Sequence, residues 1–370
     1  MSHIENDPKY KGLAVNNGVV QPPSVNPYLQ TQMRKKRKKY TVSEFVDGIL
    51  KGNRVILSQA VTLLESAQPD HQAKAQEIIE KCLPFAGKSV RVGITGVPGA
   101  GKSTFIEALG MFLAKQNHQL AVLAIDPSSE RSKGSILGDK TRMEELSRQP
   151  NAFIRPSPSA GSLGGVARKT RETIVLCEAA GFDIIFVETM GVGQSEIVVH
   201  SMVDFFLLLQ VAGTGDELQG IKRGIMEMVD GIAINKADGD NVDRVNVTKA
   251  QLVSALHMFP LPDSGWSPLV MTCSAKFHVN IEQVWEMVIN YIDFVRQNGY
   301  FKKNRIQQAN YWMYETINEQ LKSHFYNDLT VDRYVKEFEQ KIFSNEICSF
   351  AAASQLLDLY FNHSLPINDD

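Results

Sequence analysis

Residues 96–103 read Gly-Val-Pro-Gly-Ala-Gly-Lys-Ser, and the prediction of the fold starts from them. They match the pattern GxxxxGK[ST], with an apolar run at 91–95 before them and helical spacing at 102–116 after them. Glycines let the backbone wrap closely around an anion, so that successive N–H groups and the N-terminus of the next helix point at a phosphate. The sequence therefore predicts a phosphate-binding loop between a strand and a helix.

The lysine and the serine at the end of this loop supply its chemistry. Lys102 is expected to span the β- and γ-phosphates of a nucleotide, and the Ser103 hydroxyl is expected to coordinate Mg²⁺. A glycine-rich turn that only caps a helix is the alternative, but such a turn needs no lysine at this position. The predicted nucleotide contacts of the loop are Gly96, Val97, Pro98, Gly99, Ala100, Gly101, Lys102, Ser103 and Thr104.

The middle of the chain alternates short apolar runs with longer amphipathic segments. Each apolar run has the length of a strand and is apolar on both faces, as the strands of a covered parallel sheet must be. This alternation predicts an α/β fold with a doubly wound, mostly parallel sheet over residues 86–298. The expected strands are 91–95, 120–126, 183–188, 204–210, 231–235 and 269–274, with helical spacing at 102–116, 162–180, 242–258 and 280–297.

Helices are expected on both sides of this domain. Residues 41–85 place apolar side chains at three- and four-residue spacing, which predicts two or three amphipathic helices. After Tyr300 the strand signals stop, and residues 299–370 read as three further helices. Residues 1–40 are polar and end in a basic run, which we interpret as a solvated tail rather than a contact with nucleic acid or anionic lipid.

Composition narrows the class of protein. The 370 residues are 43% hydrophobic and carry a net charge of -2, so no global field draws the chain to nucleic acid or an anionic membrane. The four cysteines lie far apart without a CxxC pair, which is typical of a reduced protein and argues against a zinc or disulfide framework. The sequence shows no apolar run of membrane-spanning length and no signal-peptide pattern. We expect a cytoplasmic protein without nucleic-acid or membrane partners.

A second motif indicates the base of the nucleotide. Residues 235–238 read Asn-Lys-Ala-Asp at the end of a predicted strand and fit the NKxD signature, although this composition is also common in turns. Guanine offers two adjacent donors, N1–H and the N2 amino group, which one carboxylate accepts together, so Asp238 would prefer guanine over adenine. Lys236 would lie along the base, and Asn235 would tie neighbouring loops together. An amide of Ser274, Ala275 or Lys276, at the next strand end, would meet guanine O6.

Carboxylates near other strand ends indicate a metal site. Glu188 begins the stretch Glu-Thr-Met-Gly, at a place where nucleotide hydrolases carry DxxG to hold a Mg²⁺-bound water and the γ-phosphate. Asp126 ends another predicted strand, and Asp139 is a third acid, for which a helix cap is the alternative. With the Ser103 hydroxyl and two phosphates, these acids would complete an octahedral Mg²⁺ site.

The residues that orient the attacking water, and those that couple the nucleotide to a partner, are less clearly marked in the sequence than the phosphate and base residues. Val192 follows Gly191 where many small GTPases use a glutamine to orient water, and Gln194 lies two positions further along. A glycine-rich, charged loop at 213–222 follows another predicted strand and ends in Lys222. We predict that this loop reports the nucleotide state to a partner and that Lys222 supports hydrolysis; a simple connection into a helix is the alternative.

Five stretches together resemble one known family. They are GVPGAGKST, AIDPSSERSKGSILGDKTRM, RPSPSAGSLGGVARKTRET, FVETMGVGQSE and GTGDELQGIKRGI. The family is the MeaB/ArgK type of P-loop GTPase, also labelled LAO/AO transport ATPases, with the human methylmalonic aciduria type A protein as a member. The resemblance runs from about Thr41 to Leu357. GVGQSE and GDELQGIK are its most specific parts, because generic GTPases lack them.

The resemblance implies a function as well as a fold. It implies Mg²⁺-dependent hydrolysis of GTP to GDP, and a role in loading, protecting or reactivating an adenosylcobalamin-dependent methylmalonyl-CoA mutase. It also implies a homodimer formed by the C-terminal helices. Carried over residue by residue, Asp126, Asp139 and Glu188 are metal-site acids, and 127–138, 189–196 and 213–224 are three switches. Met190 departs mildly from the pattern, since a smaller aliphatic residue is expected there.

Other interpretations are less consistent with the sequence. An amino-acid transport ATPase or kinase conflicts with the guanine signature, and a metal-insertion GTPase of the hydrogenase or urease type would bring His- or Cys-rich segments. A non-hydrolysing scaffold would not need the full set of phosphate, metal and base residues. In the C-terminal helices, a pairing surface and plain core packing are both open for the aromatic residues Tyr311, Trp312, Tyr314, Phe325 and Tyr334.

Overall fold

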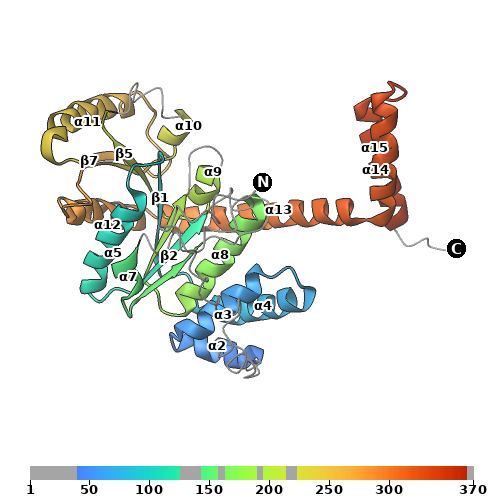
Figure 1. Cartoon of the computed structure of the whole chain (residues 1–370), viewed down its shortest axis with the longest axis horizontal. Helices are drawn as coiled ribbons and strands as arrows, with labels where there is room; N and C mark the ends of the chain where they lie inside the picture. The colour runs from blue at the N-terminus through green and yellow to red at the C-terminus, as the bar shows by residue number, and fades with distance from the viewer. Residues whose placement is uncertain (1–39, 126–142, 157–162, 190–194, 214–222, 365–370) are drawn as a thin grey trace, which may run out of the picture. The chain divides into compact units, whose positions relative to one another are not determined.

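A parallel sheet forms the centre of the protein, as predicted. The computed structural model describes residues 40–125, 143–156, 163–189, 195–213 and 223–364 (Figure 1). Within them, seven strands pair in parallel in the order β3-β2-β4-β1-β5-β6-β7. The strands are β1 (Val90–Gly96), β2 (Leu120–Ile125), β3 (Ala152–Arg155), β4 (Ile184–Thr189), β5 (Phe205–Val211), β6 (Gly231–Asn235) and β7 (Leu269–Thr272).

Strand β1 lies in the middle of the sheet and carries the phosphate-binding motif at its end. It pairs with β4 on one side and β5 on the other, with Val92 opposite Phe186 and Phe205. Strands β2, β4, β5 and β6 are buried along their whole length, which explains their continuous apolar runs. The C-terminal ends of the central strands therefore share one edge of the sheet.

The edge strand β3 was not predicted. It is four residues long, too short to show a period, and within the described residues it pairs with β2 alone. The six predicted strands match the observed ones to within two residues at each end, and β6 matches at both ends.

Helices cover both faces of the sheet. On one face α5 (Lys102–Lys115) and α12 (Ile281–Gln297) enclose an apolar core that includes Phe105, Tyr291 and Phe186. On the other face α8 (Leu163–Ala179) packs on β2, and α9 (Ser195–His200) packs on β4 and β1. The shorter elements are α7 (Glu144–Ser147), α10 (Arg223–Met226), η2 (Leu83–Phe85) and η3 (Gly239–Asn241), and α11 (Val242–Leu256) lies beside β7.

Three N-terminal helices precede the sheet, in agreement with the prediction. They are α2 (Val42–Leu50), α3 (Arg54–Glu65) and α4 (Pro69–Cys82). The Asn53 side chain caps α3 by accepting from the amides of Val55 and Ile56, and Pro69 begins α4, where its missing N–H costs nothing. Helices α3 and α4 pack against α8, so they add a further layer on that face.

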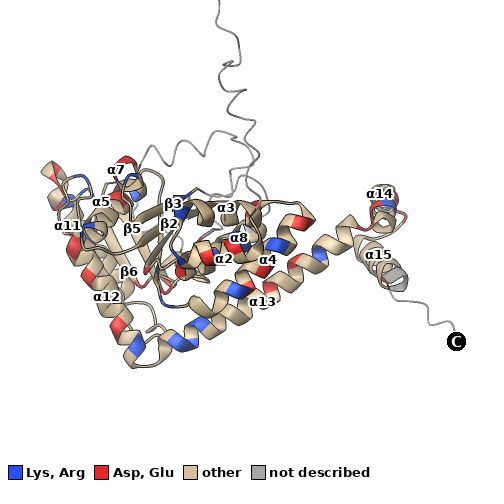
Figure 2. Ribbon diagram, turned by 90° about the horizontal axis from the view of Figure 1, so that it is seen from below, with Lys and Arg blue, Asp and Glu red and all other residues tan. Residues whose placement is uncertain are grey.

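Three helices follow the sheet domain, also as predicted. They are α13 (Tyr300–Asn327), α14 (Leu329–Phe343) and α15 (Ser349–Ser364). Figures 1 and 2 show the pair α14 and α15 at the far end of α13, away from the sheet. Asp328 caps α14 by accepting from the amides of Thr330 and Val331. In the described ranges no helix combines the length and apolar character required to cross a membrane.

Candidate nucleotide-binding site

The phosphate-binding motif forms the turn between β1 and α5, where it was predicted. Strand β1 ends at Gly96, and α5 begins at Lys102. Gly101, the residue before α5, has a left-handed backbone (φ 89°), and a Cβ added there would lie 2.7 Å from the Asn235 amide nitrogen. The first amides of an α-helix have no partner within the helix, so the start of α5 presents N–H groups to an anion.

Lys102 is the buried cation of this turn. Its side chain donates to the carbonyl oxygens of Gly96 at 2.8 Å and Val97 at 3.4 Å. Burial lowers the pKa of Lys102, while the carboxylates of Glu188 and Glu196 act in the opposite direction. These carbonyls keep the ammonium group at the loop.

Ser103 and Glu188 meet beside the turn. Glu188 lies near the end of β4 and is buried, and the Ser103 hydroxyl donates to its Oε1 at 3.3 Å. Next to it, the Thr189 hydroxyl donates to the Thr95 hydroxyl at 3.0 Å and joins β4 to β1. A hydroxyl and a carboxylate at this distance are oxygen ligands of the kind that Mg²⁺ prefers.

Several predicted residues lie outside the described residues. Asp126, Asp139 and Lys222 are among them, as are most of the three switch segments. Their roles stay predictions.

Asn235 connects the phosphate loop to the loop after β7. It is the last residue of β6 and is buried, and its Nδ2 donates to the Ala100 carbonyl at 2.8 Å. Its Oδ1 accepts from the Ala275 amide at 2.9 Å, and the Cys273 thiol approaches the same oxygen at 3.9 Å. The Asn235 side chain, at the end of β6, thus joins the phosphate loop to the loop after β7.

Asp238 and Ser274 are joined at the neighbouring strand ends. The Ser274 hydroxyl donates to Asp238 Oδ2 at 2.5 Å, and the Ala237 amide donates to the Cys273 carbonyl at 3.0 Å. These bonds fix the carboxylate at the end of β6 against the end of β7. The structure therefore brings together the two strand ends that the sequence motifs singled out for the base.

Glu196 is a buried acid that the sequence analysis placed in the second switch, 189–196, without giving it a role of its own. It lies in the first turn of α9, is 3% exposed, and is near enough to Lys102 to raise the pKa of that ammonium group. The residue belongs to the GVGQSE stretch, but nothing in the sequence indicates that its carboxylate is buried. Two acids, Glu188 and Glu196, therefore accompany one lysine in this site.

Comparisons with known proteins identify one family. Residues 57–330 match the family described as methylmalonyl Co-A mutase-associated GTPase MeaB. The chain is 44% identical to GTPase ArgK of Escherichia coli over 316 residues, 85% of this chain and 96% of that protein. It is 43% identical to the mouse (Mus musculus) mitochondrial methylmalonic aciduria type A homolog over 329 residues, 86% of this chain and 79% of that protein. A crystal structure of an LAO/AO transport system kinase superposes with a TM-score of 0.71 at 37% identity, covering 88% of this chain and 99% of that one.

Proposed function

Because this chain belongs to the family of methylmalonyl-CoA mutase-associated GTPases, it is a GTPase, and we propose that its GTP hydrolysis loads, protects or reactivates an adenosylcobalamin-dependent methylmalonyl-CoA mutase. The family match over residues 57–330 is the observation that supports this proposal most strongly. The mouse relative is named for methylmalonic aciduria, and the family name also contains methylmalonyl.

The geometry supports a specific division of roles in nucleotide binding. GTP places its β- and γ-phosphates against the amides of α5, and the Lys102 ammonium turns from the carbonyls of Gly96 and Val97 toward them. Asp238, already oriented by Ser274, accepts the two donors of guanine, and Lys236 lies along the base. An ATP-dependent kinase would have no use for this carboxylate, which favours the GTPase over the kinase alternative.

Mg²⁺ fits the ligands that the structure shows. Ser103 and Glu188 would hold the ion, with Asp126 and Asp139 as the further acids that the sequence indicates. When bound, the ion neutralises negative charge on the phosphates during transfer to water. The chain's own residues orient the nucleotide around it, because Asn235 fixes the phosphate loop relative to the base loop.

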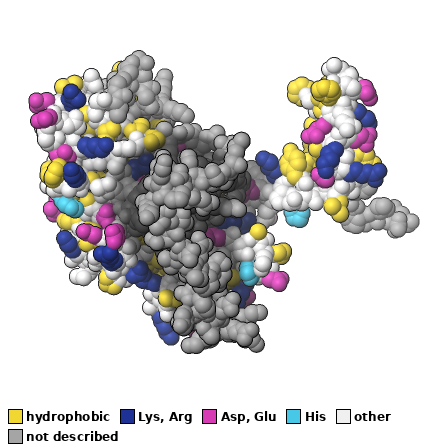
Figure 3. Space-filling view, in the orientation of Figure 1, with side chains coloured by type: hydrophobic (Ala, Val, Ile, Leu, Met, Phe, Trp, Pro, Cys, Tyr) yellow, Lys and Arg dark blue, Asp and Glu magenta, His cyan; other side chains and the backbone are white. Residues whose placement is uncertain are grey.

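An exposed apolar face on α13 supports the proposed homodimer. Ile306, Met313, Ile317 and Leu321 lie at helical spacing and are each about half exposed. Figure 3 shows further hydrophobic side chains on the surface of α14 and α15, and Phe343 and Phe350 are 92% and 87% exposed. Such a face is unusual for a monomer, so we propose that a second copy of this chain covers it.

Surface variants test the dimer without removing a packed helix. Replacing Ile317 and Leu321 together by glutamate should convert the full chain to a monomer in light scattering. Lys322→Glu, which reverses a charge next to this face, is the control and should stay dimeric. A double variant with the mass of the unmodified dimer would show that the contact lies elsewhere.

The mutase proposal is tested by single-turnover GTP hydrolysis with and without the mutase from the same organism. We expect the mutase to accelerate hydrolysis. Lys222→Ala should reduce the stimulated rate more than the basal rate, with nucleotide affinity little changed. If the mutase gives neither stimulation nor a complex, the chaperone proposal fails and the GTPase activity alone remains.

A further inference from the structure

The first half of α13 is fastened to the N-terminal ends of the central strands. Arg305 donates to both carboxylate oxygens of Asp204, at 2.7 and 2.6 Å. The same guanidinium donates to the carbonyl oxygens of Gly87 at 2.8 Å and Ser89 at 2.7 Å, just before β1. Figure 2 shows α13 passing beside the sheet domain. This end of α13 is therefore a fixed point.

Two further side chains of the same face hold the segment between α9 and β5. Gln308 Nε2 donates to the Val203 carbonyl at 2.7 Å, and the Trp312 indole N–H donates to the Ser201 carbonyl at 3.0 Å. Both side chains are buried, at 5% and 7% exposure. Because α9 ends at His200, these bonds fix the chain directly at the end of that helix.

Helix α9 is short, and its first turn carries the buried Glu196, whose charge acts on Lys102. Glu196, in its first turn, and Ser201, just after its end, are separated by roughly 8 Å along the helix axis at about 1.5 Å per residue. The helix also rests tightly on β1: a Cβ added to Gly93 would lie 2.9 Å from the Val199 side chain. With the sheet on one side and α13 at its end, α9 has little freedom to move.

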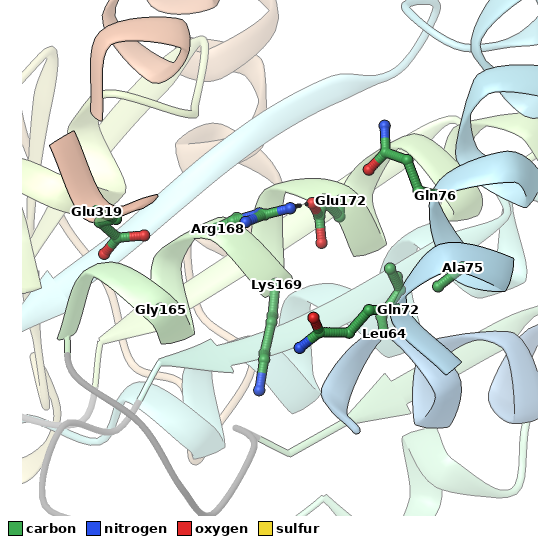
Figure 4. A pocket seen from close by; sticks show the side chains of 9 residues that line it. All are labelled: Leu64, Gln72, Ala75, Gln76, Gly165, Arg168, Lys169, Glu172 and Glu319. Carbon is green, nitrogen blue, oxygen red and sulfur yellow. Dashed lines mark hydrogen bonds and ion pairs between the residues drawn. The ribbon is translucent and has the colours of Figure 1, made fainter. Parts of the chain in front are cut away.

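Helix α8 keeps the Trp312 ring in place from the other side. The Arg171 guanidinium lies over that ring at 5.5 Å and donates to the Gln308 carbonyl at 3.0 Å. Figure 4 shows that Glu319, two turns further along α13, lies beside Arg168 near the start of α8. The inner face of α13 thus follows α8 over several turns and orients the indole N–H toward Ser201.

We propose that Trp312 and Gln308 are positioning residues for GTP hydrolysis, which hold α9 against β4 and β1 and so keep its buried Glu196 in place. The inference rests on the GTPase activity and does not depend on the mutase. It gives the C-terminal helices a role in turnover as well as in assembly.

The alternative is that these bonds only fasten the C-terminal helices to the sheet domain. In that case their loss would lower stability and leave the chemistry unchanged. The two cases differ in whether the effect on hydrolysis depends on Glu196.

Trp312→Phe is the main test, because it removes the indole N–H and keeps an aromatic ring under Arg171. Its single-turnover GTP hydrolysis should fall about threefold to tenfold, the expected range for one lost hydrogen bond, with the Kd for GDP unchanged. Tyr314→Phe, on the exposed side of the same helix, is the matched control and should hydrolyse GTP at the unmodified rate. A Trp312→Phe rate equal to this control would overturn the proposal.

A double-mutant cycle separates positioning from fastening. In a Glu196→Gln background, Trp312→Phe should cause little further loss, because both changes act on the same interaction. Equal fold-losses in the two backgrounds would show that Trp312 does not act through Glu196. If the unmodified protein hydrolyses no GTP at all, the activity itself is wrong, and this outcome is distinct from failure of the inference.

Gln308→Met is a second variant in case Trp312→Phe folds poorly. It removes the bond to Val203 but also removes Oε1, a buried oxygen without a hydrogen-bond partner in the described structure. Thermal stability should therefore change little, while hydrolysis falls by about the same factor as in Trp312→Phe. Hydrogen exchange of residues 195–201 should become faster in both variants. Unchanged hydrolysis and exchange in Gln308→Met would contradict the proposal.

Discussion

Asn235→Ala is the sharpest test of how the nucleotide site is organised. The substitution leaves the Ala100 carbonyl and the Ala275 amide without the partners that now lie at 2.8 and 2.9 Å. A buried polar group that loses its partner costs about 1–3 kcal/mol, so the pair costs about 2–6 kcal/mol in the free energy of unfolding. We expect the lower half of this range, because water can enter the space next to an open site.

The larger consequence concerns binding, because the two bonds join the phosphate loop to the base loop. Without Asn235 the nucleotide must order both loops itself. If about 1.4–2.8 kcal/mol of binding energy is used in this way, the Kd for GDP rises about 10- to 100-fold. Isothermal titration with GDP gives the Kd, and urea unfolding of the nucleotide-free protein gives the stability.

Asn241→Ala is the matched control in the same loop. Its Nδ2 donates to the Lys236 carbonyl at 2.9 Å, but the side chain is more exposed, so its loss should change stability by no more than about 0.5 kcal/mol. The reasoning is refuted if Asn235→Ala binds GDP as tightly as this control.

Four further predictions concern single side chains. Asp238→Asn should weaken the binding of GDP and strengthen the binding of XDP in calorimetric competition, because xanthine carries a carbonyl where guanine carries the N2 donor. Equal affinity of the unmodified protein for ADP and GDP would contradict the guanine assignment. Lys102→Ala should lose most GTP affinity or turnover at an unchanged urea midpoint, and unaltered hydrolysis would show that the loop does not serve phosphates. Glu188→Ala should raise the Mg²⁺ concentration needed for half-maximal hydrolysis, a shift absent only if Glu188 is not near the ion. Burial raises the pKa of Asp230 from 3.8 to about 7, so the folded state binds more protons than the unfolded chain in this window and stability falls as pH rises through it. Asp230→Asn should therefore make the urea midpoint less dependent on pH between about pH 4 and pH 7, and an unchanged pH dependence would show that other groups cause it.

Much of the fold was predictable because its signals are local. The phosphate loop needs a strand, three glycines and a helix within about twenty residues, and all of them are adjacent in the sequence. Continuous apolar runs predict the buried strands, and apolar residues at three- and four-residue spacing predict the C-terminal helices. Strand β3 was not predicted because four residues at the edge of a sheet are too few to show a period.

The arrangement of the site depends on contacts that the sequence does not record. Asn235 bonds to Ala100 across 135 residues, and Trp312 bonds to Ser201 across 111. Neither pairing leaves a periodic pattern, because each is set by which strand ends and helix faces the chain brings together. For the same reason the motif containing Glu196 was visible in the sequence while the burial of its carboxylate was not. Local backbone chemistry specifies which loop can hold a phosphate, but burial and distance between remote side chains arise only when the sheet and α13 have packed.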